Sequence, residues 1–179
     1  MNKLSILLAN GFEEIEALAP LDVLRRLNYE VELVSMNNTL EVISSHNVTF
    51  KADKVYDEKV ELSQGLIIPG GMPGSINLRD DNRVIDLVKK FKEENKLICA
   101  ICAGPIVLGR ANILNDIEVT SYPGFENELN CKNYLNEKVV VSKNIITSRG
   151  PATAFDFAFA IANYLGLDTS SLEKGMLFK

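Results

Sequence analysis

The sequence predicts an α/β protein in which a mostly parallel sheet carries helices on both faces. Two observations carry this prediction. Short apolar segments alternate along the chain with longer segments whose apolar residues recur at helical spacing, which is the pattern of βαβ units. Several short segments are apolar almost throughout, as expected for strands that are covered on both sides. The 179 residues suffice for one such fold, so we expect residues 1–179 to form a single domain.

The first half of the chain supplies two buried strands, a helix and a small hairpin. Strands are predicted over residues 4–9 and 30–35, and an amphipathic helix over 14–28 that bends at Pro20. Residues 41–56 form two short alternating segments around a polar turn, which predicts a hairpin or a small edge sheet. The helix prediction rests on the spacing of Ile15, Leu18, Ala19, Val23, Leu24 and Leu27.

The second half repeats the alternation of strands and helices. A buried strand leads into a glycine-rich loop, an amphipathic helix follows, and a second apolar strand comes next. Short strands, an apolar helix that begins at a Gly-Pro pair and a short closing helix complete the chain. The predicted strands are 65–69, 96–101, 118–121, 138–141 and 144–148, and the two longer helices are 82–94 and 151–165.

Composition and charge exclude several classes of partner. The net charge is −5, and acidic and basic residues are mixed without a basic patch, so specific nucleic-acid binding is not expected. No apolar run approaches the ~20 residues of a membrane span, so no membrane association is expected. The first apolar segment is too short for a signal peptide and is followed by Glu13, Glu14 and Glu16, which favours a cytoplasmic protein. Three cysteines do not make a disulfide framework in a chain of this size.

The loops that follow the predicted strands locate the candidate site. The carboxyl ends of parallel strands meet at one edge of a sheet, and sites form in the crevice outside them. Four loops meet that description, over residues 11–16, 70–74, 102–104 and 148–151. We therefore expect a functional site where these loops converge.

Cys102 stands at a predicted strand-to-helix corner. The apolar strand 96–101 precedes it, the chain turns at Ala103 and Gly104, and Pro105 suits the first position of a helix. Such a corner is the geometry of a nucleophile elbow, and a thiol at a helix N-terminus is expected to ionise more readily than a free cysteine. The alternative is an inert core residue, since free cysteine is among the most buried residue types.

Glu16 is the candidate acid or base beside this thiol. Glu13 and Glu14 are explained by the preference of a first helical turn for acidic residues. Glu16 lies two residues beyond Glu14 and points another way, so it can lean over the sheet edge toward Cys102. A carboxyl buried there would have a raised pKa, and the pKa of the thiol would fall if the carboxyl kept its proton and donated a hydrogen bond. The alternative is that Glu16, too, only complements the helix dipole.

The loop 70–74, Gly-Gly-Met-Pro-Gly, is predicted to supply backbone donors. It lacks the Lys-Ser/Thr ending of a P-loop and the spacing of a dinucleotide fingerprint. Its backbone N–H groups are expected to face the elbow and to form an anion hole with the N–H of Ala103. This arrangement would stabilise an oxyanion formed at Cys102.

Two other site classes are disfavoured. Cys99 and Cys102 form a Cys-x-x-Cys pair, but an odd spacing in a strand puts the side chains on opposite faces, so Cys99 is assigned to the core. Cys131 receives no role, and no spacing in the chain makes a metal site. His46 is the only histidine and falls in the predicted hairpin, so a Cys-His hydrolase is disfavoured unless His46 or a partner chain supplies the base.

Four segments in this order resemble the ThiJ/PfpI superfamily, and most closely its Parkinsonism-associated protein deglycase branch. They are Gly11-x-Glu-Glu-x-Glu16, Leu66-Ile-Ile-Pro-Gly-Gly71, Ile101-Cys-Ala-Gly-Pro105 and Thr147-Ser-Arg-Gly-Pro151. Each motif alone is weak, whereas the four together are specific and span essentially the whole chain. The resemblance implies a flavodoxin-like, doubly wound fold and a homodimer.

The resemblance also implies roles for individual residues. Cys102 matches the reactive, easily oxidised cysteine of the family, and Glu16 matches the protonated glutamate that hydrogen-bonds its sulfur. Gly71 and Ala103 match the backbone donors of the anion pocket.

Three further residues are candidate supporting residues by the same resemblance. Asp22 matches an acidic residue that often partners a histidine near the cysteine, and Tyr122 stands at that histidine's position. Arg149 belongs to the fourth motif, and His46 stands where some family members carry arginine. The chain therefore departs from the family at the residue on which the histidine-assisted mechanism depends, and the resemblance leaves open whether Tyr122 takes over part of that role.

The resemblance implies a cofactor-free glyoxalase or deglycase that acts on methylglyoxal-type dicarbonyls or on their adducts. Thiol, carboxyl and anion hole would supply the nucleophile, the acid or base and the electrostatic stabilisation without a metal. A second hypothesis is a redox sensor or chaperone-like stress protein in which Cys102 oxidises to a sulfinate held in the same pocket. An amidase or peptidase is a weaker third hypothesis, because no histidine is predicted near the thiol.

Overall fold

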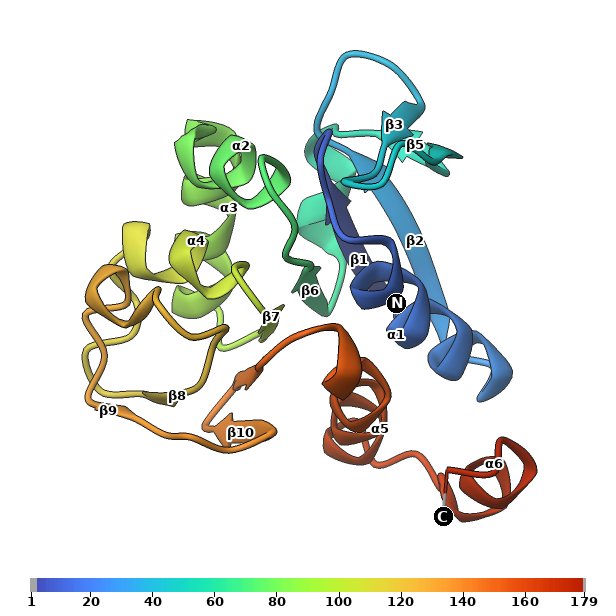
Figure 1. The fold of residues 1–179 in the computed structure, drawn as a ribbon. Helices are drawn as coiled ribbons and strands as arrows, with labels where there is room; N and C mark the ends of the chain where they lie inside the picture. Colours follow the sequence, from blue (N-terminus) through green and yellow to red (C-terminus); the bar gives the residue numbers. More distant parts are fainter. Residues whose placement is uncertain (1–2, 179) are drawn as a thin grey trace.

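A computed structural model describes residues 3–178 of the chain, and its central feature is a seven-stranded sheet between two groups of helices (Figure 1). The strands are β1 Lys3–Leu8, β2 Glu30–Ser35, β3 Glu41–Ile43, β4 Thr49–Lys51, β5 Lys54–Val55, β6 Gly65–Ile68, β7 Leu97–Ile101, β8 Glu118–Val119, β9 Asn133–Tyr134, β10 Val139–Ser142 and β11 Ile145–Ser148. The α-helices are α1 Glu14–Arg26, α2 Gly74–Asp80, α3 Asn82–Glu93, α4 Pro105–Arg110, α5 Ala154–Tyr164 and α6 Ser170–Gly175. Three short 3-10 helices cover Glu58–Leu62, Glu126–Glu128 and Pro151–Thr153.

The main sheet has the strand order β10-β11-β7-β6-β1-β2-β5. Every neighbouring pair in it is parallel except β10 with β11. The chain runs outward from β1 to β2 and β5 and then returns to the other side of β1 for β6 and β7, so the strand order reverses between β1 and β6. Ligand sites of doubly wound sheets lie at such a switch point, outside the carboxyl ends of the strands. The predicted α/β fold with a mostly parallel, doubly wound sheet is confirmed.

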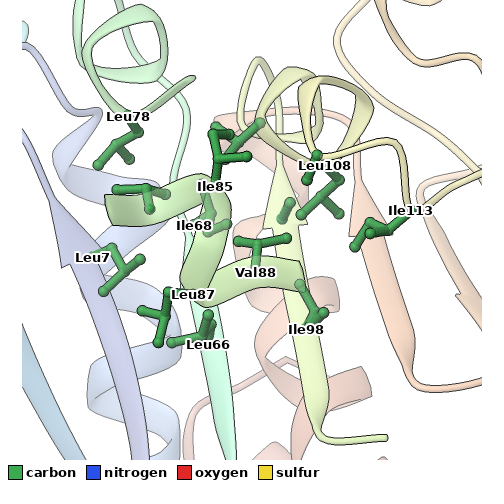
Figure 2. Packing of buried hydrophobic residues seen from close by; sticks show 14 of the residues in the cluster. Leu7, Leu66, Ile68, Leu78, Ile85, Leu87, Val88, Ile98, Leu108 and Ile113 are labelled. Carbon is green, nitrogen blue, oxygen red and sulfur yellow. The ribbon is translucent and has the colours of Figure 1, made fainter. Parts of the chain in front are cut away.

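The sheet separates two cores because successive residues of a strand point to opposite faces. Leu7 of β1 packs with α3 and α4, whereas its neighbour Ile6 packs with α1 and α5. Figure 2 shows the first of these cores, where Leu66 and Ile68 of β6 lie close to Val88 of α3. Full burial of such side chains stabilises the fold by about 1.5–3 kcal/mol each, so the strand ends that carry the site stand on a rigid base.

Most predicted elements agree with the structure to within a few residues. The helix expected over 14–28 is α1, and the helix expected over 82–94 is α3. The hairpin expected within 41–56 is formed by β3 and β4, whereas β5 leaves it and joins the edge of the main sheet beside β2. The helix expected over 151–165 begins with one 3-10 turn before α5.

Two features of the fold were not predicted from the sequence. The segment 74–80 continues from the glycine-rich loop as helix α2, although its pattern is weak because it buries only Gly74, Ser75 and Leu78. The strand expected over 118–121 shortens to β8, which pairs with β9 in a separate small sheet.

Within residues 3–178, no helix combines the length and the apolar character that crossing a bilayer requires.

Candidate active site

Cys102 directly follows β7, at the turn that leads into α4. Its φ is +62°, a left-handed conformation that is rare for a residue with a side chain. Two backbone hydrogen bonds hold this conformation: the N–H of Cys102 donates to the carbonyl of Ser148 at 3.0 Å, and the N–H of Tyr122 donates to the carbonyl of Cys102 at 2.9 Å. The thiol is free and half-buried at the carboxyl end of the sheet. The turn thus raises one sulfur above the strand ends, as a nucleophile elbow does.

Glu16 reaches the same place from the first turn of α1. Its side chain is fully buried, and its Oε2 accepts a hydrogen bond from the N–H of Gly70 at 2.7 Å. Glu13 caps the helix by accepting the N–H of Glu16 at 2.8 Å, which fixes the backbone that carries this carboxyl. Burial raises the pKa of Glu16 to about 7, against the hydrogen bonds of Cys102 and Gly70, which lower it. A neutral carboxyl is therefore well populated near neutral pH.

The space around Gly70 shows how closely Glu16, Cys102 and Ala103 converge. A Cβ at this position would lie 2.5 Å from Oε2 of Glu16, 2.7 Å from Cβ of Cys102 and 3.0 Å from the backbone N of Ala103. Real Cβ atoms do not approach other atoms this closely, so only glycine fits. Carboxyl, thiol and backbone amide therefore surround one small volume at the strand ends.

The electrostatics of Cys102 differ from the expectation. Burial raises the pKa of the thiol above its ordinary value, and the charge and hydrogen bond of Glu16 raise it further, whereas the N–H groups of Ala103 and Gly71 lower it. The expectation that Cys102 ionises more readily than a free cysteine is wrong while Glu16 carries a charge, because burial and the carboxylate outweigh the turn of helix behind it. A thiolate beside a protonated Glu16 avoids that repulsion.

Two backbone amides face the sulfur from different loops. The amides belong to Gly71 and Ala103, and both act to lower the pKa of Cys102. Gly71 has a φ of +91°, and a Cβ there would lie 2.4 Å from the backbone N of Glu13, so the loop can pass between α1 and the elbow only with glycine at this position. Two converging N–H groups of this kind are suited to hold a negatively charged oxygen.

The three candidate supporting residues are placed differently. Asp22 lies on the exposed side of α1, where its carboxylate pairs with Nε of Arg26 at 2.8 Å. Within residues 3–178, no hydrogen bond joins Asp22 to Cys102 or Tyr122. Tyr122 and Arg149 line a hollow of about 300 Å³ beside the elbow. The structure thus brings Tyr122 and Arg149 to the site region, and it does not support the expected role of Asp22.

The remaining cysteines and the histidine lie outside the convergence. Cys99 is fully buried in the core beneath α1 and α5, where burial raises the pKa of its thiol, and Cys131 is a free, half-buried loop cysteine. His46 contacts Glu14 at 3.0 Å, and that hydrogen bond raises the pKa of the imidazole. In the part of the chain that the structure describes, one cluster has the side chains to hold a metal ion: ligand atoms of Glu13, Glu14 and His46 lie within 4.8 Å of one another.

Sequence reasoning missed three contacts that shape the site. Glu13 was explained by the helix dipole, yet it is the residue that caps α1 and anchors the backbone of Glu16. Gly70 and Ser148 bond Glu16 and Cys102 directly, and both contacts cross between segments far apart in the chain. Only the N-cap contact has a local signal, since a side-chain acceptor just before a helical pattern is typical of an N-cap.

Comparison with known proteins agrees with this geometry. The model of the DJ-1/PfpI family matches residues 2–164. The chain belongs to the DJ-1/PfpI family. Among solved structures, one titled "Toxoplasma gondii DJ-1, oxidized" is 36% identical and superposes with a TM-score of 0.86, covering 92% of this chain and 91% of that one. The resemblance inferred from the four motifs is confirmed at the level of the family.

Two curated relatives show the range of names within the family. Protein DJ-1 homolog B of Arabidopsis thaliana is 37% identical over 156 residues, which cover 86% of this chain and 36% of the relative. This chain therefore spans about a third of that relative's length. A Bacillus subtilis relative, named "Putative cysteine protease YraA", is 35% identical over 152 residues and is matched over 89% of its length.

Proposed function

We propose that this DJ-1/PfpI protein is a cysteine-dependent, cofactor-free glyoxalase or deglycase that acts on methylglyoxal-type dicarbonyls or their adducts. The observation that carries the proposal is the convergence of Cys102, Glu16 and the N–H groups of Gly71 and Ala103 around one small volume. These groups are a nucleophile, a proton carrier and an oxyanion hole, the three functions that the reaction needs.

The first chemical step is addition of the Cys102 sulfur to the aldehyde carbon of the dicarbonyl. A carbon–sulfur bond forms, the carbonyl π electrons move to oxygen, and this oxygen rests on the N–H groups of Gly71 and Ala103. The thiol proton passes to that oxygen, which gives a hemithioacetal. Because burial disfavours the free thiolate, the attack and the proton transfer are expected to be concerted.

Glu16 then moves a proton between the two substrate carbons. Its carboxylate removes the proton from the former aldehyde carbon, and the resulting enediol takes a proton at the neighbouring carbon. A carboxyl whose pKa is about 7 can both accept and return a proton near neutral pH. The product of this step is a thioester on Cys102.

Hydrolysis of the thioester completes the cycle. Water adds to the thioester carbon, the carbon–sulfur bond breaks and the thiol of Cys102 is restored. Methylglyoxal plus water thus becomes lactate, with no net oxidation or reduction. Early adducts of methylglyoxal with thiols or amines release the same aldehyde carbon to Cys102, so deglycation needs no additional residues. We place this activity in a cytoplasmic homodimer.

The test is steady-state consumption of methylglyoxal with detection of lactate. Cys102→Ser should abolish turnover because an alcohol is a far weaker nucleophile, and Glu16→Gln should lower kcat by about 100-fold or more because proton transfer is lost. Cys131→Ser is the matched control, since Cys131 lies outside the convergence, and should keep the wild-type rate. Full activity in Cys102→Ser or Glu16→Gln would contradict the proposal.

A redox role is the second candidate, favoured by the half-buried free thiol beside two N–H donors. Two molecules of hydrogen peroxide would convert the Cys102 thiol to a sulfinate and release two molecules of water. Gly71 and Ala103 would then hold one sulfinate oxygen, and a protonated Glu16 would donate to the other. Each cysteine would react once, which separates this role from catalysis.

Peptidase chemistry is the weaker candidate, although one relative carries a cysteine-protease name. It requires a base close to the thiol. The single histidine, His46, bonds to Glu14, and among the described residues no hydrogen bond connects it to Cys102.

A further inference from the structure

Arg149 carries a guanidinium without a partner among residues 3–178. Its Nη1 is buried and donates to no acceptor among the described residues. Four of the five other arginines differ, since Arg25, Arg26, Arg79 and Arg83 each bond a carboxylate. Leaving a buried charged donor unpaired costs about 1–3 kcal/mol or more, so an acceptor from outside the chain would relieve a real penalty.

Glu126, an acid whose pKa the charge of Arg149 lowers, forms no ion pair with Arg149 among the described residues. The pKa of Glu126 is lowered first by backbone N–H groups, its own and that of Gly124, and only to a lesser extent by the charge of Arg149. Oε2 of Glu126 is already bonded to the N–H of Gly124 at 2.9 Å. The charges of Arg149 and Glu126 therefore interact without a hydrogen bond between them, and the Nη1 donor of Arg149 stays available.

The guanidinium borders a hollow with mostly apolar walls. The hollow measures about 300 Å³, and its walls are Tyr122, Pro123, Arg149, Gly150, Pro151, Ala152 and Thr153. A Cβ on Gly150 would lie 3.5 Å from the ring of Tyr122, in ordinary van der Waals contact, so Gly150 and this ring face each other across the hollow. A space of this size fits a short substituent.

The hollow adjoins the candidate nucleophile through both backbone bonds of Cys102. Ser148, which accepts the N–H of Cys102 at 3.0 Å, directly precedes Arg149. Tyr122, which donates to the carbonyl of Cys102 at 2.9 Å, forms the opposite wall. The hollow is therefore tied to the backbone of Cys102 through Tyr122 and through the residue that precedes Arg149, which places it beside the elbow.

We propose that this hollow is a substituent subsite in which Arg149 binds a carboxylate on the far end of a dicarbonyl substrate. The inference rests on the proposed function and names its substrate class: short α-ketoaldehydes that carry a terminal carboxylate. The planar guanidinium matches a carboxylate with two parallel hydrogen bonds, and the buried Nη1 is a donor that such a carboxylate would satisfy. Methylglyoxal lacks this group and would leave the subsite empty.

The test compares two substrates, methylglyoxal and dioxovalerate, an α-ketoaldehyde that ends in a carboxylate. Wild type should convert dioxovalerate to hydroxyglutarate with a higher kcat/KM than it shows for methylglyoxal. Arg149→Gln should lower the ratio of the two kcat/KM values by about 10-fold or more, because a charge-assisted bidentate pair is lost. Arg149→Lys should restore part of that ratio, because it keeps the charge without the planar fork.

Arg110→Gln is the matched control, since Arg110 lies exposed in the last turn of α4, and it should leave the ratio unchanged. An equal ratio in wild type and Arg149→Gln would overturn the subsite and leave the proposed function intact. If wild type converts neither substrate, the proposed function fails. Titration calorimetry with glutarate, on wild type and Arg149→Gln, then tests carboxylate binding at the subsite independently of turnover. Binding that Arg149→Gln abolishes would support it, and equal or absent binding in both proteins would overturn it.

Discussion

At the residue scale, the protonation of Glu16 controls what the pocket can do. The carboxyl is fully buried, and its Oε1 has no hydrogen-bond partner among the described residues. Burial therefore favours the protonated form and raises the pKa to about 7. A protonated Glu16 can donate to the sulfur of Cys102 and spares it the repulsion of a nearby carboxylate.

This burial predicts a pH-dependent stability that Glu16→Gln removes. The pKa of Glu16 is about 7 in the folded state against 4.5 for an ordinary carboxyl. The folded protein therefore holds this proton more tightly than the unfolded chain, and the stabilisation, complete below pH 4.5, is lost as the pH rises through about 7. The loss amounts to about 3 kcal/mol in wild type and is absent from the variant.

Urea unfolding at about pH 5 and about pH 8 measures this difference. Between the two conditions, the free energy of unfolding of Glu16→Gln should gain about 2.5 kcal/mol relative to wild type. Glu30→Gln serves as the control, because Glu30 is exposed at the start of β2, and it should follow the wild-type pH dependence. A constant difference between Glu16→Gln and wild type would mean that this carboxyl does not titrate in that range.

The left-handed backbone of Cys102 gives a second prediction at this scale. With a φ of +62°, any side chain at this position is strained, whereas glycine adopts the conformation freely. Cys102→Gly should therefore be more stable than Cys102→Ala by about 1 kcal/mol. Chemical denaturation of the two variants, both without a thiol, measures the strain separately from the chemistry. A more stable alanine variant would show that the elbow relaxes when the sulfur is removed.

At the scale of elements, the loop after β6 is what brings the backbone donors to the elbow. Gly71 lies at a φ of +91° with no room for a Cβ, while Gly124 lies at a φ of +100° with no atom within 4 Å of its Cβ position. Gly124→Ala should cost only the strain of the left-handed backbone, about 1 kcal/mol. Gly71→Ala should cost about 2–4 kcal/mol, because steric overlap with the backbone of residues 11–13, just before α1, is added to that strain.

Thermal unfolding of the two alanine variants checks this prediction, and activity gives a second readout. Only Gly71→Ala should also impair methylglyoxal turnover, because it displaces an N–H group that faces the sulfur of Cys102. Equal losses of stability in the two variants would mean that the loop moves aside to accept a side chain.

Local patterns predicted the long elements and the location of the site, and cross-chain contacts account for what they missed. The apolar spacing of α1 and α3 and the glycine-rich loop are visible in the sequence, as is the corner at Cys102. The bond from Gly70 to Glu16 joins residues 54 positions apart, and no local pattern encodes such a pairing. The raised pKa of Cys102 was missed for the same reason, because it depends on burial by distant segments.

At the scale of the whole molecule, one sheet is shared by two cores. Phe91 of α3 is fully buried on one face, and Phe157 of α5 is fully buried on the other. Because both cores pack on the same strands, unfolding of either helix layer would expose apolar residues of the sheet to water. The site at the strand ends therefore depends equally on both faces.

This sharing predicts a single cooperative unfolding transition for the chain. Phe91→Ala and Phe157→Ala should each lower the free energy of unfolding by about 3–5 kcal/mol without splitting the transition. Circular dichroism and tyrosine fluorescence should give coincident curves in urea. Phe155→Ala is the control, because Phe155 is 41% exposed, and should change stability by only about 0.5 kcal/mol. Two separate transitions would show that the two faces fold independently, against the expected single domain.

The central claim is that Cys102 turns substrate over instead of being consumed by it. The most direct measurement is the molar ratio of lactate formed to protein after a long incubation with excess methylglyoxal. The account predicts a ratio far above one, with the Cys102 thiol recovered unmodified at the end. A ratio of one or less, with Cys102 left modified, would contradict it and would favour the redox role of the same thiol.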